Sequence, residues 1–178
     1  MIVKWMALLF LPLLLPARLE KQDDIPWSAA RRLEWSDFSG QPDGNNVNAA
    51  LTSSKVVFSY NYSSRDGFNW HIACLFDKNR SWVRIKNDLI LAHEQGHFDI
   101  TEIYARKLQK QMKNYSFNKD RVQKDVPAIY QAIMQEQNDV QNRYDEQTNH
   151  SRTKDKQLAW LEKIKKELNE LKEYADYK

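Results

Sequence analysis

Two histidines and a glutamate in the middle of the chain have the types and the spacing of a metal site. His93, Glu94 and His97 form the pattern HExxH within a stretch, Leu91 to Ile100, that has the periodicity of a helix. Residues four apart on a helix lie one above the other, so His93 and His97 direct their imidazoles at one point. Glu94 is rotated by about 100° from His93, which places its carboxylate beside that point as a base for bound water. The pattern predicts a Zn²⁺ ion held by the two histidines, with Glu94 as the catalytic base.

The residues around the pattern favour a metal site over a helix with two incidental histidines. Apolar residues continue the helix face that carries the imidazoles, at Leu89, Ala92, Ile100, Tyr104 and Leu108, so both rings should point inward. Two buried imidazoles without a partner would be costly. Gly96 costs about 1 kcal/mol relative to alanine inside a helix, which predicts that another group packs closely against it.

A catalytic zinc usually has three protein ligands and one open position, so the pattern needs a third ligand. Glu102 points about 140° away from the histidine face, and the third histidine of the extended motif is absent at position 103. The remaining candidates are His150, Asp145 and Glu136. We expect His150 to be the third ligand, with Asp145 as the second choice, because zinc accepts both imidazole and carboxylate. His71 lies in a predicted strand and is expected to be structural or exposed.

A small sheet and three helices must position these residues. Alternating aromatic and polar residues predict an antiparallel sheet within residues 33–85, in which 33–38 form a short strand or an anchoring segment. The pattern lies on a predicted helix over 88–113, with Asn87 or Asp88 as its N-cap. Two further helices are predicted over 125–145 and 154–176, the first with Pro127 in its first turn. The sequence therefore predicts an α+β fold, zincin-like, with a small antiparallel sheet packed on the active-site helix and two long helices after it.

The N-terminal residues and the charge balance indicate where the protein works. Lys4 and the apolar run after it predict a signal peptide over residues 1–17, which leaves 18–178 as a single domain in a secreted or periplasmic protein. The 27 basic and 24 acidic residues are interspersed, so we expect no nucleic-acid partner and no membrane association after signal removal. The apolar stripe of the last helix is expected to pack on the other helices rather than to form a dimer seam, which predicts a monomer.

Four motifs together resemble a bacterial family of secreted zinc-dependent proteases, long catalogued only as a domain of unknown function. They are Trp35-Ser36-Asp37-Phe38, the run from His93 to Ile100, Tyr144-Asp145-x-x-Thr148-x-His150, and Gln157-x-x-Trp160. The resemblance covers most of the chain. It implies an exported bacterial protein with a zincin-like α+β fold, the two motif histidines as zinc ligands, Glu94 as base, and a role for Asp145 or His150. The family pattern has glycine after the late histidine, where this chain has Ser151.

These observations predict a zinc-dependent metallopeptidase that hydrolyses peptide bonds in a peptide or protein substrate by a zinc-activated water, with Glu94 as general base. An extended substrate is expected to pair with the strand at 82–85, just before the motif helix. Tyr144 is a candidate donor to the oxyanion. The alternative is an exported binding or assembly protein whose metal is structural or absent and whose last helix forms a contact surface.

Overall fold

The sheet and the helices of the protein form separate layers. The computed structural model describes residues 24–42, 44, 47–65 and 67–177, so the predicted signal peptide lies outside the described residues. One antiparallel sheet has the order β1-β4-β3 and a second has the order β2-β5; the strands are β1 (Ile25–Pro26), β2 (Ala50–Leu51), β3 (Ser54–Ser63), β4 (Gly67–Phe76) and β5 (Trp82–Val83). The helices are α1 (Asp88–Asn114), α2 (Val122–Thr148) and α3 (Lys154–Glu170), with short 3₁₀ helices η1 (Trp35–Asp37) and η2 (Lys172–Tyr174). An α+β fold with a small antiparallel sheet and three helices is thereby confirmed.

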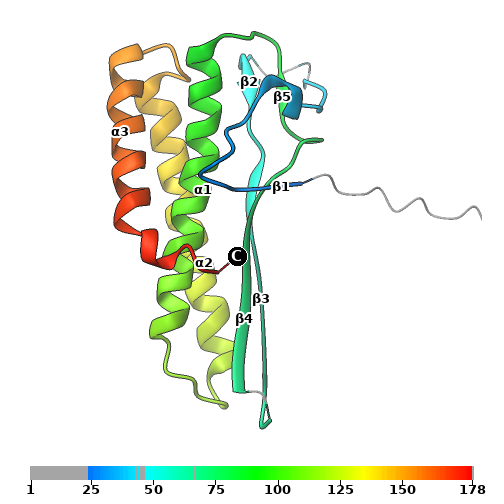
Figure 1. Cartoon of the computed structure of the whole chain (residues 1–178), viewed down its shortest axis with the longest axis vertical. Helices are drawn as coiled ribbons and strands as arrows, with labels where there is room; N and C mark the ends of the chain where they lie inside the picture. Colours follow the sequence, from blue (N-terminus) through cyan, green and yellow to red (C-terminus); the bar gives the residue numbers. More distant parts are fainter. Residues whose placement is uncertain (1–23, 43, 45–46, 66, 178) are drawn as a thin grey trace, which may run out of the picture.

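Helix α1 is the central element, because the sheet packs on one side of it and α2 and α3 pack on the other (Figure 1). Its buried residues therefore occur on all sides rather than along one stripe, as expected for a helix enclosed by the fold. Ile103, Ala105 and Leu108 are each at most 2% exposed. The helix begins where the Asn87 side chain accepts a hydrogen bond from the Ile90 amide at 2.8 Å, the N-cap arrangement that the sequence predicted.

The long hairpin of β3 and β4 runs beside α1 and α2 (Figure 1). Its alternating residues place an aromatic row toward the helices, where Phe58 stacks on Tyr130 of α2 at a ring separation of 5.5 Å. The Tyr130 hydroxyl donates to the Val56 carbonyl at 3.2 Å, which ties α2 to the outer strand of the sheet. His71 belongs to the opposite, exposed side of β4.

Residues 33–38 form an anchoring segment and not a strand. Trp35–Asp37 is a 3₁₀ helix, because the buried Asp37 carboxylate accepts hydrogen bonds from the Glu34 amide at 2.9 Å and from Arg31 at 2.7 Å and closes the chain into a turn. Phe38 then packs edge-on against Phe76 of β4, with ring centroids 5.1 Å apart.

Helices α2 and α3 differ at their ends from the expected ranges. Helix α2 begins at Val122, so Pro127 lies beyond its first turn. Helix α3 ends at Glu170 because the chain then bends through η2 back onto α1. Arg106 of α1 donates to the Leu168 carbonyl at 2.7 Å and satisfies an acceptor in the last turn of α3. Among the described residues, we find no helix whose length and apolar character would suit it to span a membrane.

Candidate metal centre

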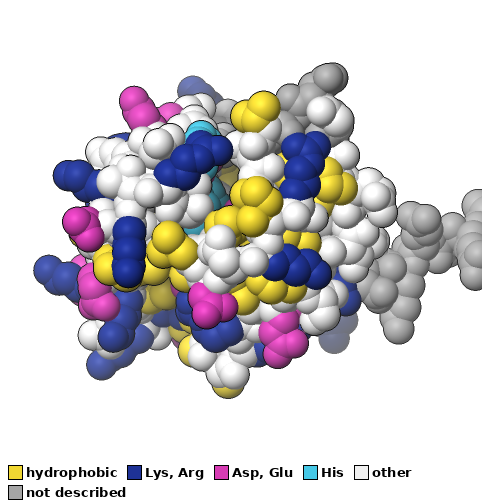
Figure 2. Space-filling model, turned by 90° about the horizontal axis from the view of Figure 1, so that it is seen from above, with side chains coloured by type: hydrophobic (Ala, Val, Ile, Leu, Met, Phe, Trp, Pro, Cys, Tyr) yellow, Lys and Arg dark blue, Asp and Glu magenta, His cyan; other side chains and the backbone are white. Residues whose placement is uncertain are grey.

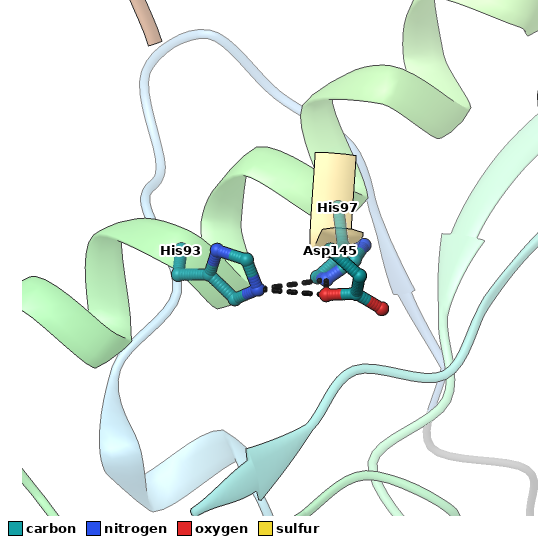
Figure 3. Close-up of side chains that lie close together, drawn as sticks. All are labelled: His93, His97 and Asp145. Atoms are coloured by element: carbon teal, nitrogen blue, oxygen red, sulfur yellow. Dashed lines mark hydrogen bonds and ion pairs between the residues drawn. The ribbon is translucent and has the colours of Figure 1, made fainter. Parts of the chain in front are cut away.

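Helices α1 and α2 bring two imidazoles and one carboxylate to a single point. His93 and His97 come from α1 and Asp145 comes from α2, and the three side chains point toward one another (Figure 3). The Asp145 Oδ1 atom lies 3.0 Å from His93 Nε2 and 3.1 Å from His97 Nε2, and the two nitrogens are 3.2 Å apart. One ligand atom of each residue therefore occupies a corner of a nearly equilateral triangle.

The size and chemistry of this triangle fit a tetrahedral zinc site. Bonds of about 2.0–2.2 Å in tetrahedral geometry separate neighbouring ligand atoms by about 3.3–3.6 Å, slightly more than the observed 3.0–3.2 Å. Two imidazole nitrogens and one carboxylate oxygen are a ligand set that catalytic zinc uses, with the fourth position left for water or substrate. The residues present are thus able to hold zinc.

Gln141 fixes which nitrogen of His97 carries a proton. Its amide Nε2 donates to the His97 carbonyl at 2.9 Å, so its Oε1 must be the atom that lies 2.6 Å from His97 Nδ1. Nδ1 is therefore the N–H donor, and Nε2 directs its lone pair at the Asp145 carboxylate unless it is protonated too. The Nε2 lone pair and the carboxylate oxygen repel each other, so they attract only through a cation between them, either a proton or a metal ion. Metal-bound histidines are commonly oriented by this kind of hydrogen bond on the other ring nitrogen.

The ionisable groups of the triangle shift one another's pKa. Burial acts to raise the pKa of Asp145, but hydrogen bonds with His93 and His97 outweigh it and hold that pKa well below its usual range. For His93, the loss of solvation on burial prevails, and its pKa lies below 6.5. Burial also opposes the charged form of His97, but the Asp145 hydrogen bond and the Glu94 charge prevail and raise the His97 pKa. These shifts favour the charged forms of Asp145 and His97 and disfavour the charged form of His93.

Tyr144 forms a rigid support beneath the two imidazoles and explains Gly96. Its ring stacks on His93 with centroids 4.5 Å apart and meets His97 edge-on at 5.0 Å. A Cβ at Gly96 would lie 2.8 Å from the Tyr144 Cζ atom and closer still to its hydroxyl oxygen, so only glycine allows this approach. The close packing that the sequence predicted at Gly96 is confirmed.

The centre opens into a cleft of about 340 Å³ between α1, α2 and the segment 48–54. Figure 2 shows histidine side chains within a hollow whose rim carries Lys and Arg side chains. Glu94 borders the cleft and is 4% exposed, and its Oε2 atom is buried without a hydrogen-bond partner among the described residues. A buried acceptor without a partner is costly in a structure that has no use for it. Thr52 donates to the Glu94 carbonyl at 3.1 Å and joins the cleft wall to α1.

The structure corrects two secondary predictions about the cleft. Tyr144 is fully buried and its hydroxyl donates to the His93 carbonyl at 3.3 Å, so it does not reach the cleft to stabilise an oxyanion. The strand at 82–85 does not border the cleft, because β5 pairs with β2 and the cleft is lined by 48–54, which contains β2. Strand order decides this point, and strand order was not evident from the local pattern of residues 82–85.

Only one of the two candidates for third ligand, Asp145, lies in the triangle. Asp145, the second choice from the sequence, contributes its carboxylate to the triangle, whereas His150, the first choice, is not among the three residues whose ligand atoms lie within 4.8 Å of one another. His150 borders the cleft, and its Nδ1 atom lies 3.3 Å from Asp145 Oδ1. His71 is on the exposed side of β4, and Glu136 is an exposed residue of α2 that does not line the cleft.

Sequence reasoning missed Gln141 and the hydrogen-bond network on the opposite side of α1. Gln141 and Asp145 are four residues apart on α2, so helical spacing could have placed them on one face. On the other side of α1, Asp99 accepts hydrogen bonds from Gln95 at 2.7 Å, from Trp27 at 2.8 Å and from Arg32 at 3.1 Å. The oxygen of the Gln95 side chain accepts a hydrogen bond from the Leu33 backbone amide at 2.7 Å. This network attaches the N-terminal segment to the helix that carries the site.

The chain belongs to a family of bacterial proteins of unknown function (DUF922), whose sequence profile matches residues 20–151. The match covers the whole of α1 and α2, and therefore every residue of the triangle, and it ends before α3. No curated protein and no solved structure matches the chain.

Proposed function

We propose that this protein is a zinc-dependent metallopeptidase with a zincin-like arrangement, exported to the periplasm or the cell exterior. The observation that carries the proposal is the triangle of His93, His97 and Asp145 with the buried Glu94 Oε2 atom beside it, which has no hydrogen-bond partner among the described residues. A purely structural metal site has no need of an additional buried carboxylate at its edge. Export is inferred from the signal-like residues 1–17.

Each residue of the centre has a role that follows from its position. His93, His97 and Asp145 would hold zinc, which lowers the pKa of a bound water and polarises a carbonyl group. Glu94 Oε2 accepts the proton that water loses as its oxygen bonds to the scissile carbonyl carbon. The same carboxyl group then delivers that proton to the amine nitrogen as the carbon–nitrogen bond breaks.

The cleft wall supports a substrate in extended form. Strand β2 pairs with β5 along one edge, and its residues Ala50 and Leu51 lie in the segment 48–54 that lines the cleft. A peptide that lies along this segment gains backbone hydrogen bonds without regard to its side chains. Thr52 connects that segment to the backbone of Glu94, so the peptide and the base are held in a fixed relation.

Glu94→Gln tests the proposal most simply. The amide cannot accept the proton, so hydrolysis of a mixture of internally quenched peptides should fall by about 10²–10⁴-fold, while one zinc per chain is retained. Glu146→Gln, a neutralisation at an exposed position of α2, is the matched control and should leave the rate unchanged. Undiminished hydrolysis by Glu94→Gln would remove the assigned base, and loss of zinc from it would make Glu94 a ligand.

A further inference from the structure

The chain after α2 follows a backbone path that its residues do not favour. Three consecutive residues, Asn149, His150 and Ser151, have φ values of +48°, +50° and +71°. Helices commonly end on one left-handed residue, usually glycine or asparagine, and Asn149 fits that rule as the C-cap of α2. His150 and Ser151 continue the left-handed path beyond the cap, in a region that residues with a side chain enter seldom, although asparagine, aspartate and histidine enter it more often than the others.

The consequence of this path is the position of the His150 imidazole. The His150 amide donates to the Asp145 carbonyl at 3.0 Å, which closes the turn back on the last residues of α2. The side chain borders the cleft and is 42% exposed. Among the described residues, its one polar contact is with the triangle, where Nδ1 lies 3.3 Å from Asp145 Oδ1. The ring therefore contacts the triangle through Nδ1 and borders the cleft.

Unfavourable backbone conformations persist where the surrounding structure imposes them, and they concentrate at functional sites. A turn used only to connect α2 with α3 would be more stable with glycine or asparagine at position 150. The His150 side chain is 42% exposed, so burial of its ring does not account for its presence. Its contact with Asp145 at the border of the cleft does.

We propose that His150 is a substrate-contacting residue of the cleft, held over the metal centre by the left-handed turn, and that it is not a metal ligand. The nitrogen remote from Asp145 is the group offered to a peptide, and it accepts a hydrogen bond from a backbone N–H in the neutral tautomer whose Nδ1–H faces the carboxylate. This assignment rests on the proposed function, because it requires that the cleft receives a peptide.

The test uses His150→Asn, since asparagine adopts the left-handed region readily but does not extend as far as imidazole. The metal-free variant should have a thermal midpoint equal to that of the wild type or higher by about 2–4 °C, because the backbone strain is relieved. Zinc content should remain one per chain. Calorimetric titration of the zinc-loaded proteins with a blocked tripeptide hydroxamate should show about 3- to 10-fold weaker binding, the loss of one hydrogen bond.

Two controls separate the alternatives. Acetohydroxamate ligates metal but carries no peptide, so its affinity should be the same in wild type and His150→Asn. Asn149→Gly frees the neighbouring backbone and leaves the imidazole in place, so its affinity for the tripeptide hydroxamate should equal that of the wild type.

The possible failures have different meanings. Loss of zinc from His150→Asn would make His150 a ligand, and a lower thermal midpoint would make it a structural residue; either result overturns the assignment. Unchanged tripeptide affinity in His150→Asn, or an equal loss in Asn149→Gly, would also overturn it and would leave the proposed peptidase intact. A wild type that binds the tripeptide hydroxamate no more tightly than acetohydroxamate would contradict both, because the cleft would then not receive peptides.

Discussion

The two sides of α1 near its N-terminus carry polar groups of similar kind that differ in whether they are hydrogen-bonded. On the side facing the N-terminal segment, both ends of the Gln95 amide are hydrogen-bonded and the Asp99 carboxylate accepts from three donors. On the side facing α2, the Glu94 Oε2 and His93 Nδ1 atoms are buried without partners among the described residues. The residues that differ in this way are neighbours in sequence and share one helix.

We interpret the first side as a structural network and the second as the site proposed for metal and substrate. A buried polar network in which every group is paired strengthens the fold, while a group left without a partner reduces stability. The paired side holds α1 against the N-terminal segment, and the unpaired side faces a cleft where a cation and a substrate would complete it. Changes on the first side should therefore act on stability, and changes on the second should act on metal and substrate.

Gln141→Leu should give the largest effect among the residues outside the triangle. The amide that orients the His97 ring is lost, and removal of such a partner weakens metal binding by about 10–100-fold. Competition with a chromophoric zinc chelator measures the affinity. Gln135→Leu, the same change at an exposed position of α2 where the Gln135 amide donates to Asp139 at 2.9 Å, should leave the zinc affinity unchanged. Equal zinc affinity in wild type and Gln141→Leu would contradict the orienting role.

Asp99→Ala should lower the stability of the fold and leave zinc binding unchanged. It removes an acceptor that two buried donors, on Trp27 and Gln95, share, so the free energy of unfolding should fall by about 1–3 kcal/mol in urea denaturation. Arg32→Ala removes only the exposed arm of the network, where the Arg32 side chain is 61% exposed, and should cost about 0–1 kcal/mol. Zinc content should remain one per chain in both. A zinc-depleted but fully stable Asp99→Ala would reverse the division between the two sides.

The folding stability of the metal-free protein should depend on pH through Asp145, an effect smaller than those of the substitutions above. The folded-state pKa of Asp145 lies below the unfolded value of 3.8, so the unfolded state takes up its proton first as the pH falls. The stability that Asp145 contributes is therefore present above about pH 4 and is lost as the pH falls below it. Urea denaturation of wild type and Asp145→Asn should show a difference in stability that narrows below pH 4. A difference that widens toward low pH would mean that the Asp145 pKa is raised.

The sequence predicted the local features of this protein better than the distant ones. Helical spacing was sufficient to place His93 and His97 together and to indicate close packing at Gly96, because these depend on the geometry of one helix. Which of Asp145 and His150 lies in the triangle with the two histidines depends on where α2 ends and which way its last turn faces α1, which no local pattern records.

The turn after α2, at residues 149–151, is another feature that the local sequence did not predict. The resemblance predicted glycine where the chain has Ser151, and the φ of +71° at this position gives the physical reason for that preference. The position of β2 between β5 and the cleft likewise follows from pairing over about thirty residues. Pairings of that range are selected by the assembled core and not by the strand sequences alone.

The zinc content of the mature protein, measured by elemental analysis beside Asp145→Ala and Asp139→Ala, tests the central claim most directly. Asp139 is an exposed carboxylate on the same helix, so its variant controls for the loss of charge. The account predicts one zinc per chain in wild type and Asp139→Ala, and an affinity lowered by more than about 100-fold in Asp145→Ala, a larger loss than removal of an orienting partner causes. A wild type that takes up no zinc after repletion, or an Asp145→Ala variant that binds zinc as tightly as wild type, would contradict it.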